Sequence, residues 1–141
     1  MGISKASAQW DGGFKDGKGR MKPANAPEAL FSVSSRFEGQ QGSNPEELLG
    51  AALAGCFSMA LTVGLETSGH KPASVRTSAD VRLEKVGAGF SITTIELTTE
   101  ASVPGLDAAR FQAIAEETKK NCPVSKALAG VKIELKASLA T

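Results

Sequence analysis

The sequence predicts an α+β fold in which one long apolar helix lies between two groups of strands. The chain has 141 residues and no break in composition, a length typical of one domain. Residues 48–65 contain no charged side chain, which predicts a helix buried at the centre of the domain. The segments on both sides of this stretch alternate between apolar and polar residues, as half-buried strands do. We therefore expect a single domain over residues 1–141.

The residues before the long helix are expected to form strands. Residues 3–10 and 14–22 flank the sequence Asp11-Gly12-Gly13, which is suited to the turn of a hairpin. Residues 31–37 then alternate between larger and more polar side chains, the period-2 pattern of a strand. This pattern places Arg36 on a strand, on the face opposite Phe37.

The long helix has a clear start in the sequence Asn44-Pro45-Glu46-Glu47. Asn44 can cap it, Pro45 fits its first position, and Glu47 stands where a capping-box glutamate belongs. We expect the helix to stop near Gly69. A membrane span of this length has to be considered, but the segment is rich in Ala and Gly and lies between strands, which favours a buried helix without membrane contact.

Small residues four apart recur on this helix, as Ala51/Gly55 and Ala60/Gly64. They allow another backbone to approach closely, either the chain's own sheet or a partner helix. Because so short a chain can hardly surround the helix on all sides, we expect a homodimer.

The next residues predict a β-hairpin. Residues 75–83 and 90–97 alternate around the turn Gly87-Ala88-Gly89. The phase of the alternation changes at Thr93-Thr94, which indicates a bulge.

Two helices and a strand are expected to complete the fold. Asp107 can cap a helix whose apolar face continues to Cys122, and Pro123 must interrupt that helix. A short helix is then expected to end at Gly130, before a last strand over residues 131–135.

Composition excludes several classes of function. The net charge is +1, so nucleic-acid binding, which needs a concentrated basic surface, is not indicated. The first ten residues have no apolar core of a signal peptide, and two cysteines without a signal indicate the cytoplasm, where structural disulfides are uncommon. One histidine and no CxxC or HExxH motif make a metal site improbable. The two thiols are either buried small side chains or redox groups.

Cys56 needs a cation if it is to react as a thiolate. An ordinary cysteine has a pKa of about 8.5, and the middle of a helix, roughly 18 Å from its start, receives little help from the helix dipole. Arg36 is the best candidate for that cation, because it is always charged and can also hydrogen-bond a peroxide oxygen. The alternative is that Arg36 is an ordinary surface residue.

Cys122, Glu46 and His70 are the other candidate site residues. Cys122 precedes Pro123, so free N–H groups of the following helix can stabilise its thiolate. Glu46 can hold Arg36 as a counter-ion, but it stands about 15 Å along the helix from Cys56. We therefore expect Glu46 either to come from a second subunit or to reach back to the site through Arg36. His70 could pair with Cys56, although a helix length separates the two in sequence. Two buried thiols in unrelated places stay an open alternative.

Several segments resemble the OsmC/Ohr family of osmotically inducible and organic-hydroperoxide-resistance proteins, and the OsmC branch in particular. The resemblance covers nearly the whole chain and rests on residues 35–39 (SRFEG), 42–52 (GSNPEELLGAA), 55–60 (GCFSMA), 79–81, 103–107 and 121–125 (NCPVS). Both cysteine motifs stand in the family's order.

The resemblance implies a thiol-dependent peroxidase with an intertwined α+β homodimer, its antiparallel sheet wrapped around the long helix. Cys56 would be the peroxidatic thiolate that becomes a sulfenic acid, and Cys122 the resolving thiol that forms a disulfide with it. Arg36 would activate Cys56, and Glu46 would orient Arg36. The implied substrates are organic hydroperoxides and hydrogen peroxide, with a lipoylated protein or another dithiol as reductant and no bound cofactor.

Two other functions fit parts of the sequence. A small dimeric ligand-binding or stress protein would have merely buried cysteines and no thiol chemistry. An acyl thioesterase of the hot-dog type also wraps a sheet around a helix, but it needs a carboxylate near mid-helix, and residues 48–65 offer none.

Overall fold

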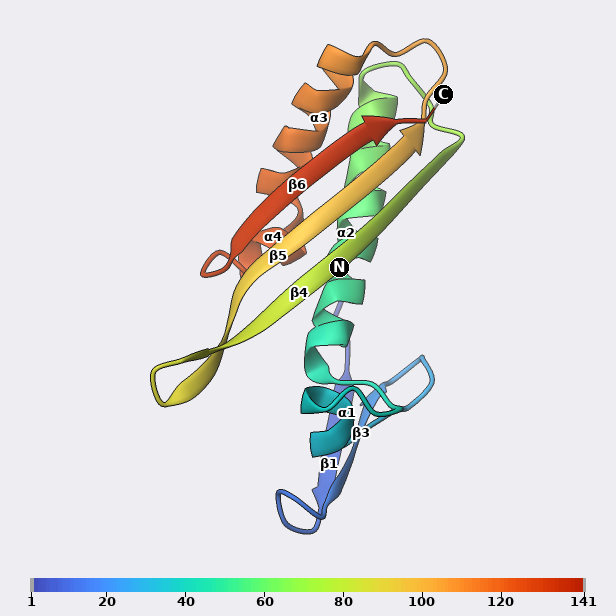
Figure 1. Cartoon of the computed structure of the whole chain (residues 1–141). Helices are drawn as coiled ribbons and strands as arrows, with labels where there is room; N and C mark the ends of the chain where they lie inside the picture. The colour runs from blue at the N-terminus through green and yellow to red at the C-terminus, as the bar shows by residue number, and fades with distance from the viewer. Residues whose placement is uncertain (1, 141) are drawn as a thin grey trace. The chain divides into compact units, whose positions relative to one another are not determined.

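A computed structural model describes residues 2–140 of the chain. The chain divides into two compact units, one ending at Leu48 and the other beginning at Leu49, and each is described on its own. The mixed α+β architecture predicted from the sequence is confirmed (Figure 1). The elements, in chain order, are β1 (Ala6–Asp11), β2 (Lys18–Pro23), β3 (Ala29–Phe31), α1 (Val33–Phe37), α2 (Pro45–Thr67), β4 (Ser74–Val86), β5 (Gly89–Ser102), α3 (Ala108–Asn121), α4 (Pro123–Ala127) and β6 (Lys132–Leu139).

The first unit contains a three-stranded antiparallel sheet in the order β1-β2-β3. The predicted hairpin is confirmed, with Trp10 opposite Gly19 and Gly19 opposite Phe31. The Trp10 and Phe31 rings lie 5.4 Å apart over this glycine. A Cβ atom at Gly19 would come within 2.6 Å of the Trp10 ring, so only glycine leaves room for both rings.

The predicted strand over residues 31–37 is wrong beyond Phe31. The strand stops there, and residues 33–37 form the helical turn α1. A capping box explains the change, because the Ser35 N–H donates to Ser32 Oγ at 3.1 Å and the Ser32 N–H donates to Ser35 Oγ at 2.9 Å. Arg36 therefore lies in the last turn of a short helix and not on a strand.

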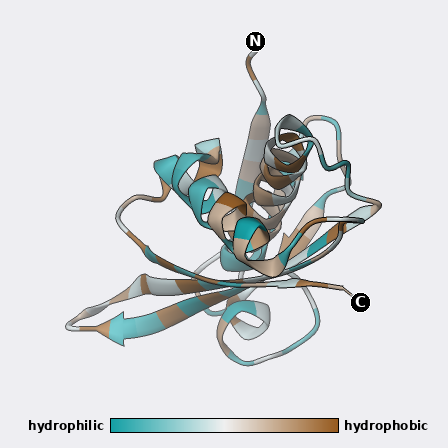
Figure 2. Cartoon of the chain, turned by 90° about the horizontal axis from the view of Figure 1, so that it is seen from above, coloured by the Kyte–Doolittle hydropathy of each residue, from teal (hydrophilic) through white to brown (hydrophobic). Residues whose placement is uncertain are grey.

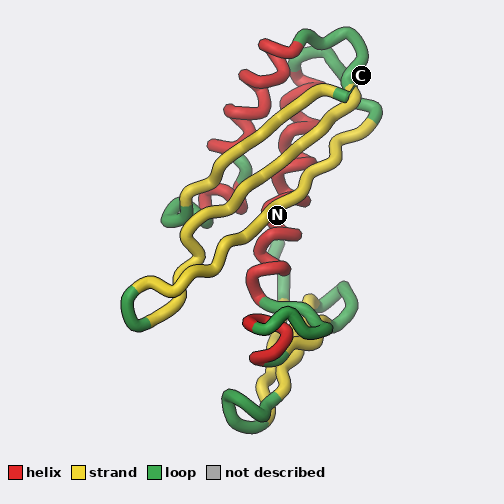
Figure 3. Tube along the Cα trace, viewed as in Figure 1, coloured by secondary structure: helices red, strands yellow, loops and turns green. Residues whose placement is uncertain are grey.

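The second unit has its own three-stranded sheet, in the order β4-β5-β6. Arg82 is opposite Thr94 while Leu83 is opposite Ile92, so Thr93 is the extra residue of the predicted bulge. Strand β6 runs parallel to β5, which differs from the antiparallel sheet expected. Helices α3 and α4 lie between these two strands in sequence, and such a crossover returns the chain to the end at which β5 began. The β4–β5 hairpin extends beyond β6 (Figure 3).

Helices α2 and α3 cover one face of this sheet (Figure 2). The core between them is formed by one row of α2, by alternate residues of β5 and by the inner face of α3. Its fully buried members are Leu53, Phe57, Leu61, Leu65, Ile95, Leu97, Thr99, Ala101, Phe111 and Ala115. The α2 row repeats every four residues, as one face of a helix does. Alternate β5 residues outside this core, such as Thr98 and Glu100, are exposed.

After Gly50, the buried residues of α2 are confined to that row. Among the described residues, α2 is the one helix long and apolar enough to cross a membrane. Core helices of soluble proteins share this length and composition, so the property alone does not indicate a membrane span. On its other side Met59 is 74% exposed and Val63 is 58% exposed. Of the small residues, Gly64 packs against Ile114 of α3, whereas a Cβ at Gly55 would meet no atom within 4 Å. The exposed apolar stripe is made up of Ala52, Gly55, Met59 and Val63.

Candidate functional site

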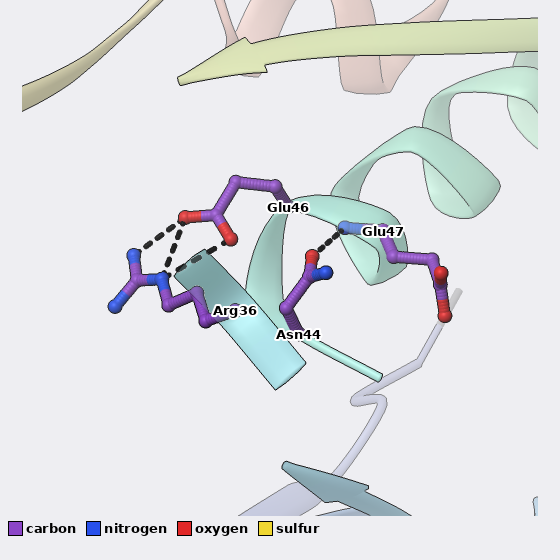
Figure 4. Close-up of polar contacts among 4 residues, drawn as sticks. All are labelled: Arg36, Asn44, Glu46 and Glu47. Atoms are coloured by element: carbon purple, nitrogen blue, oxygen red, sulfur yellow. Dashed lines mark hydrogen bonds and ion pairs between the residues drawn. The ribbon is translucent and has the colours of Figure 1, made fainter. Parts of the chain in front are cut away.

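Arg36 and Glu46 form an ion pair within the first unit (Figure 4). Arg36 Nε donates to both Glu46 carboxylate oxygens, at 3.1 and 3.2 Å, and Nη2 donates to Oε1. The Glu46 residue is 7% exposed, so its carboxylate is held in place, while the Nη1 group of the guanidinium takes no part in the pair. Glu46 therefore holds a cation whose Nη1 donors lie outside the pair.

The sequence around Glu46 explains its position. Asn44 Oδ1 accepts a hydrogen bond from the Glu47 N–H at 2.8 Å, which confirms the predicted cap of α2. Glu46 consequently lies in the first turn, where the helix dipole favours a carboxylate. Arg36 reaches it from the last turn of α1, and its guanidinium also lies 5.2 Å from the centre of the Phe37 ring.

Cys56 and Cys122 are in contact within the second unit. Both are free thiols, and their Sγ atoms are 2.9 Å apart in a hydrogen bond although 66 positions separate them in sequence. A disulfide has an S–S length of about 2.05 Å, so less than an ångström of movement separates this contact from a covalent bond. Cys56 is partly exposed and Cys122 is 1% exposed.

The position of Cys122 follows from the end of α3. Asp107 caps this helix by accepting from the Arg110 N–H at 2.9 Å, as predicted. The buried residues Phe111, Ala115 and Thr118 form its inner face, and Cys122 continues that face. Pro123 ends α3 and begins α4, which leaves the Cys122 sulfur between the two helices and beside α2.

The two thiols have opposite pKa shifts. Burial and the hydrogen bond with Cys122 raise the pKa of Cys56 above 9.0, the upper end of the ordinary range of about 8 to 9. Burial also acts to raise the pKa of Cys122, but hydrogen bonds from Cys56, Ser125 and Val124 outweigh it and lower this pKa below 9.0. Of the two thiols, Cys122 is therefore the one that loses its proton first, and Cys56 keeps its proton to higher pH. No cation is among the groups that shift either pKa within the described residues.

These shifts predict a two-step titration of the reduced chain. The ultraviolet absorbance of thiolate should rise in one step below pH 9.0 and in a second step above it. The chain has no tyrosine, so no phenolate signal overlaps. A single transition at about pH 9.0 would contradict these opposite shifts.

The same shifts set the pH dependence of stability. Between the lowered pKa and 9.0 the folded chain binds fewer protons than the unfolded one, so stability rises with pH. Above 9.0 the folded Cys56 keeps its proton longer than the unfolded thiol does, so stability falls.

A groove of about 840 Å³ between α2 and α3 opens beside Cys122. Its walls are mostly apolar and include Ala60, Val63, Gly64, Ala113 and Ile114, with Arg110 and Glu117 as charged members. Such a groove suits the hydrocarbon part of a small organic molecule.

The sequence reasoning missed an aromatic cleft beside Arg36 in the first unit. This cleft of about 410 Å³ is lined by Trp10, Phe14, Phe31 and Phe37 together with Arg36. These four aromatic residues are more than half of the chain's seven Trp and Phe residues. The concentration of aromatic residues before position 38 is therefore the signal from which the cleft could have been predicted.

His70 lies apart from the thiol chemistry. Its Nδ1 contacts the backbone oxygen and the hydroxyl of Ser68, at 3.1 and 3.4 Å, so both of these contacts lie in the turn after α2. Over residues 2–140, no group of three or more His, Cys, Asp or Glu residues gathers in a way that could hold a metal ion.

Comparisons with known proteins find relatives over most of the chain. Residues 38–136 match the family described as OsmC-like protein. The chain is 48% identical over 126 residues to the peroxiredoxin OsmC of Escherichia coli K12, with 88% of each chain covered. It is 32% identical over 111 residues to the organic hydroperoxide resistance protein OhrB of Bacillus subtilis, covering 76% of this chain and 79% of that one.

Solved structures give the same fold. An OsmC-like protein from Mycoplasma pneumoniae has a TM-score of 0.79 at 14% identity, with 99% of each chain covered. The B. subtilis OhrB structure has a TM-score of 0.70 at 25% identity, with 94% of this chain and 97% of that chain covered.

Proposed function

The chain belongs to the OsmC-like protein family, and we propose that it is a thiol-dependent peroxidase that reduces organic hydroperoxides and hydrogen peroxide. The observation that carries this proposal is the 2.9 Å contact between Cys56 Sγ and Cys122 Sγ. Relatives named peroxiredoxin OsmC and organic hydroperoxide resistance protein support it.

The first step is attack by the Cys56 thiolate on the terminal oxygen of the hydroperoxide. The O–O bond breaks, the alcohol leaves after taking up a proton, and Cys56 becomes a sulfenic acid. We assign this step to Cys56 because it is the partly exposed member of the pair, whereas Cys122 is almost fully buried.

The second step joins the two sulfurs. The Cys122 thiolate attacks Cys56 Sγ, a disulfide forms, and the sulfenic oxygen leaves as water. The lowered pKa of Cys122 suits this role, since the thiolate is the attacking form. A dithiol, for which a lipoylated protein is our candidate, then reduces the disulfide and is itself oxidised; no bound cofactor is needed.

Arg36, held by Glu46, supplies the positive charge that the thiol pair lacks. A raised pKa leaves Cys56 protonated at neutral pH, so a cation must draw the charge onto it. We assign this role to the Arg36 guanidinium, whose Nη1 group is outside the ion pair, and we assign its orientation to Glu46. The same donors can stabilise the oxygen on which charge develops as the O–O bond breaks.

We further propose that the active form is a homodimer and that the chain forms one OsmC-like domain working in the cytoplasm. The exposed apolar stripe on α2 supports the dimer, because two of its members, Met59 and Val63, leave large apolar side chains in water. A second copy can cover this stripe, with the small residue Gly55 allowing close approach.

The dimer has a direct test. The wild type should elute at twice its 14.5 kDa mass, and Met59→Glu should shift it toward the monomer by placing a charge in the contact. Val86→Glu, at an exposed residue of β4, is the matched control and should stay dimeric. Elution of the wild type as a monomer at all concentrations would refute the dimer.

Peroxide consumption tests the function itself. Wild type with cumene hydroperoxide and a dithiol should remove peroxide catalytically, and the oxidised product should contain a Cys56–Cys122 disulfide detectable by mass spectrometry. A non-enzymatic binding or stress protein, our alternative, would bind small apolar molecules but leave the peroxide concentration unchanged.

A further inference from the structure

Ser125 is a buried polar residue that the proposed reaction does not yet use. It is 6% exposed, and its Oγ forms no hydrogen bond to a nitrogen or oxygen atom among the residues that the structure describes. Buried hydroxyl groups almost always have a partner, so an unpaired one calls for an explanation.

Its place in the fold points to the Cys122 sulfur. Ser125 is the third residue of α4, three positions after Cys122, and side chains at this spacing turn back toward the residue that starts the helix. A neutral thiol is a poor acceptor, whereas a thiolate is a strong one. An unpaired hydroxyl beside a sulfur therefore has a partner as soon as that sulfur becomes charged.

We propose that Ser125 is a positioning residue whose hydroxyl donates a hydrogen bond to the Cys122 thiolate. This deepens the proposed function and rests on it for its role in the cycle. When the dithiol reduces the enzyme, one of its thiolates attacks Cys56 Sγ, the Cys56–Cys122 bond breaks, and the electron pair of that bond stays on Cys122 Sγ. The second thiol of the dithiol then displaces Cys56 from the mixed disulfide, and the dithiol leaves as a disulfide. The Ser125 O–H stabilises this leaving thiolate and later holds it ready to attack the Cys56 sulfenic acid.

The electrostatics of the site agree with this assignment. The side chain and the backbone N–H of Ser125 are both among the groups that lower the pKa of Cys122. The charged residues that line the groove beside Cys122, Arg110 and Glu117 of α3, are not among the causes of its shift. The other thiol that faces it is Cys56 of α2.

The test uses the reduced chain and needs no peroxide, so its result stands apart from that of the peroxidase assay. In a Cys56→Ala background Cys122 is the only cysteine, and its pKa can be read from thiolate absorbance against pH. Adding Ser125→Ala should raise this pKa by about one unit, which lowers the thiolate fraction about tenfold at neutral pH. In the two-cysteine chain, Ser125→Ala should slow disulfide reduction by dithiothreitol several-fold, because a more basic thiolate leaves more slowly.

Two further variants separate the hydroxyl from packing. Ser125→Thr keeps the hydroxyl and should keep the lowered pKa. Ser58→Ala removes a hydroxyl of α2 that donates to Thr77 Oγ1 at 2.7 Å, and it should leave the pKa of Cys122 unchanged. An unshifted pKa in Ser125→Ala, or an equal shift in Ser125→Thr and Ser58→Ala, would overturn the proposal.

Discussion

Cys56→Ser should reduce the rate of peroxide removal by about 10³-fold or more, because it takes away the nucleophile on which every later step depends. Serine is close to cysteine in size, and its hydroxyl cannot be oxidised to a sulfenic acid. The side chain is partly exposed, so the fold should tolerate the change. The measurement is the initial rate of cumene hydroperoxide loss with excess dithiol.

Cys122→Ser is the matched comparison and should behave differently. The Cys56 thiol is kept, so one equivalent of peroxide should still react, after which a sulfenic acid accumulates instead of a disulfide. A dimedone adduct on Cys56, identified by mass spectrometry, detects it. If Cys56→Ser kept full activity, or if dimedone labelled Cys122 in the wild type, the division of roles between the two thiols would be wrong.

The contact between the thiols could not be predicted from local sequence. Caps and breakers fix the ends of α2 and α3 locally, and Asn44, Asp107 and Pro123 all act as the sequence indicated. The 66-residue separation of Cys56 and Cys122 is instead bridged by the packing of α3 and α4, which no periodicity encodes. Only the family resemblance pointed to the pair.

Two predictions made from the local sequence, the strand over residues 31–37 and the antiparallel direction of the last strand, were wrong for physical reasons. Residues 31–37 satisfy both the alternation of a strand and the three-residue spacing of a capping box, and the hydrogen bonds between Ser32 and Ser35 decide for the helix. The direction of β6 depends on the end of β5 to which the crossover returns the chain, and this is a property of the tertiary fold. The same limit applies to Ser125, whose burial beside Cys122 becomes evident only in three dimensions.

Arg36→Ala should slow the reaction of Cys56 with peroxide by about 10²- to 10³-fold, the usual loss on removing one donor aimed at a developing negative charge. Burial and the contact with Cys122 raise the pKa of Cys56, whereas the pKa of Cys122 is lowered. Without the guanidinium, Cys56 should stay protonated at neutral pH. Alkylation of Cys56 in a Cys122→Ser background measures this directly.

Three further charge variants serve as controls for Arg36→Ala. Arg36→Lys keeps the charge but loses the fork that engages Glu46 through Nε and Nη2, so an intermediate rate is expected. Glu46→Gln should also give an intermediate rate, because it leaves Arg36 present but no longer held by a carboxylate. Arg20→Ala removes an exposed arginine whose nearest carboxylate, Asp11, is 3.9 Å away, and it should change the rate less than twofold.

The pH dependence of the Cys56 alkylation rate shows whether Arg36 activates the thiol or only supports the fold. If Arg36 lowers the pKa of Cys56, the alkylation rate of Arg36→Ala should recover toward that of wild type as the pH rises above 9.0, where the thiolate forms without help. A loss that stays the same at every pH would show that Arg36 acts through structure, and an unchanged rate at neutral pH would remove it from the site. The recovery at high pH is therefore the result that assigns the charge of Arg36 to the ionisation of Cys56.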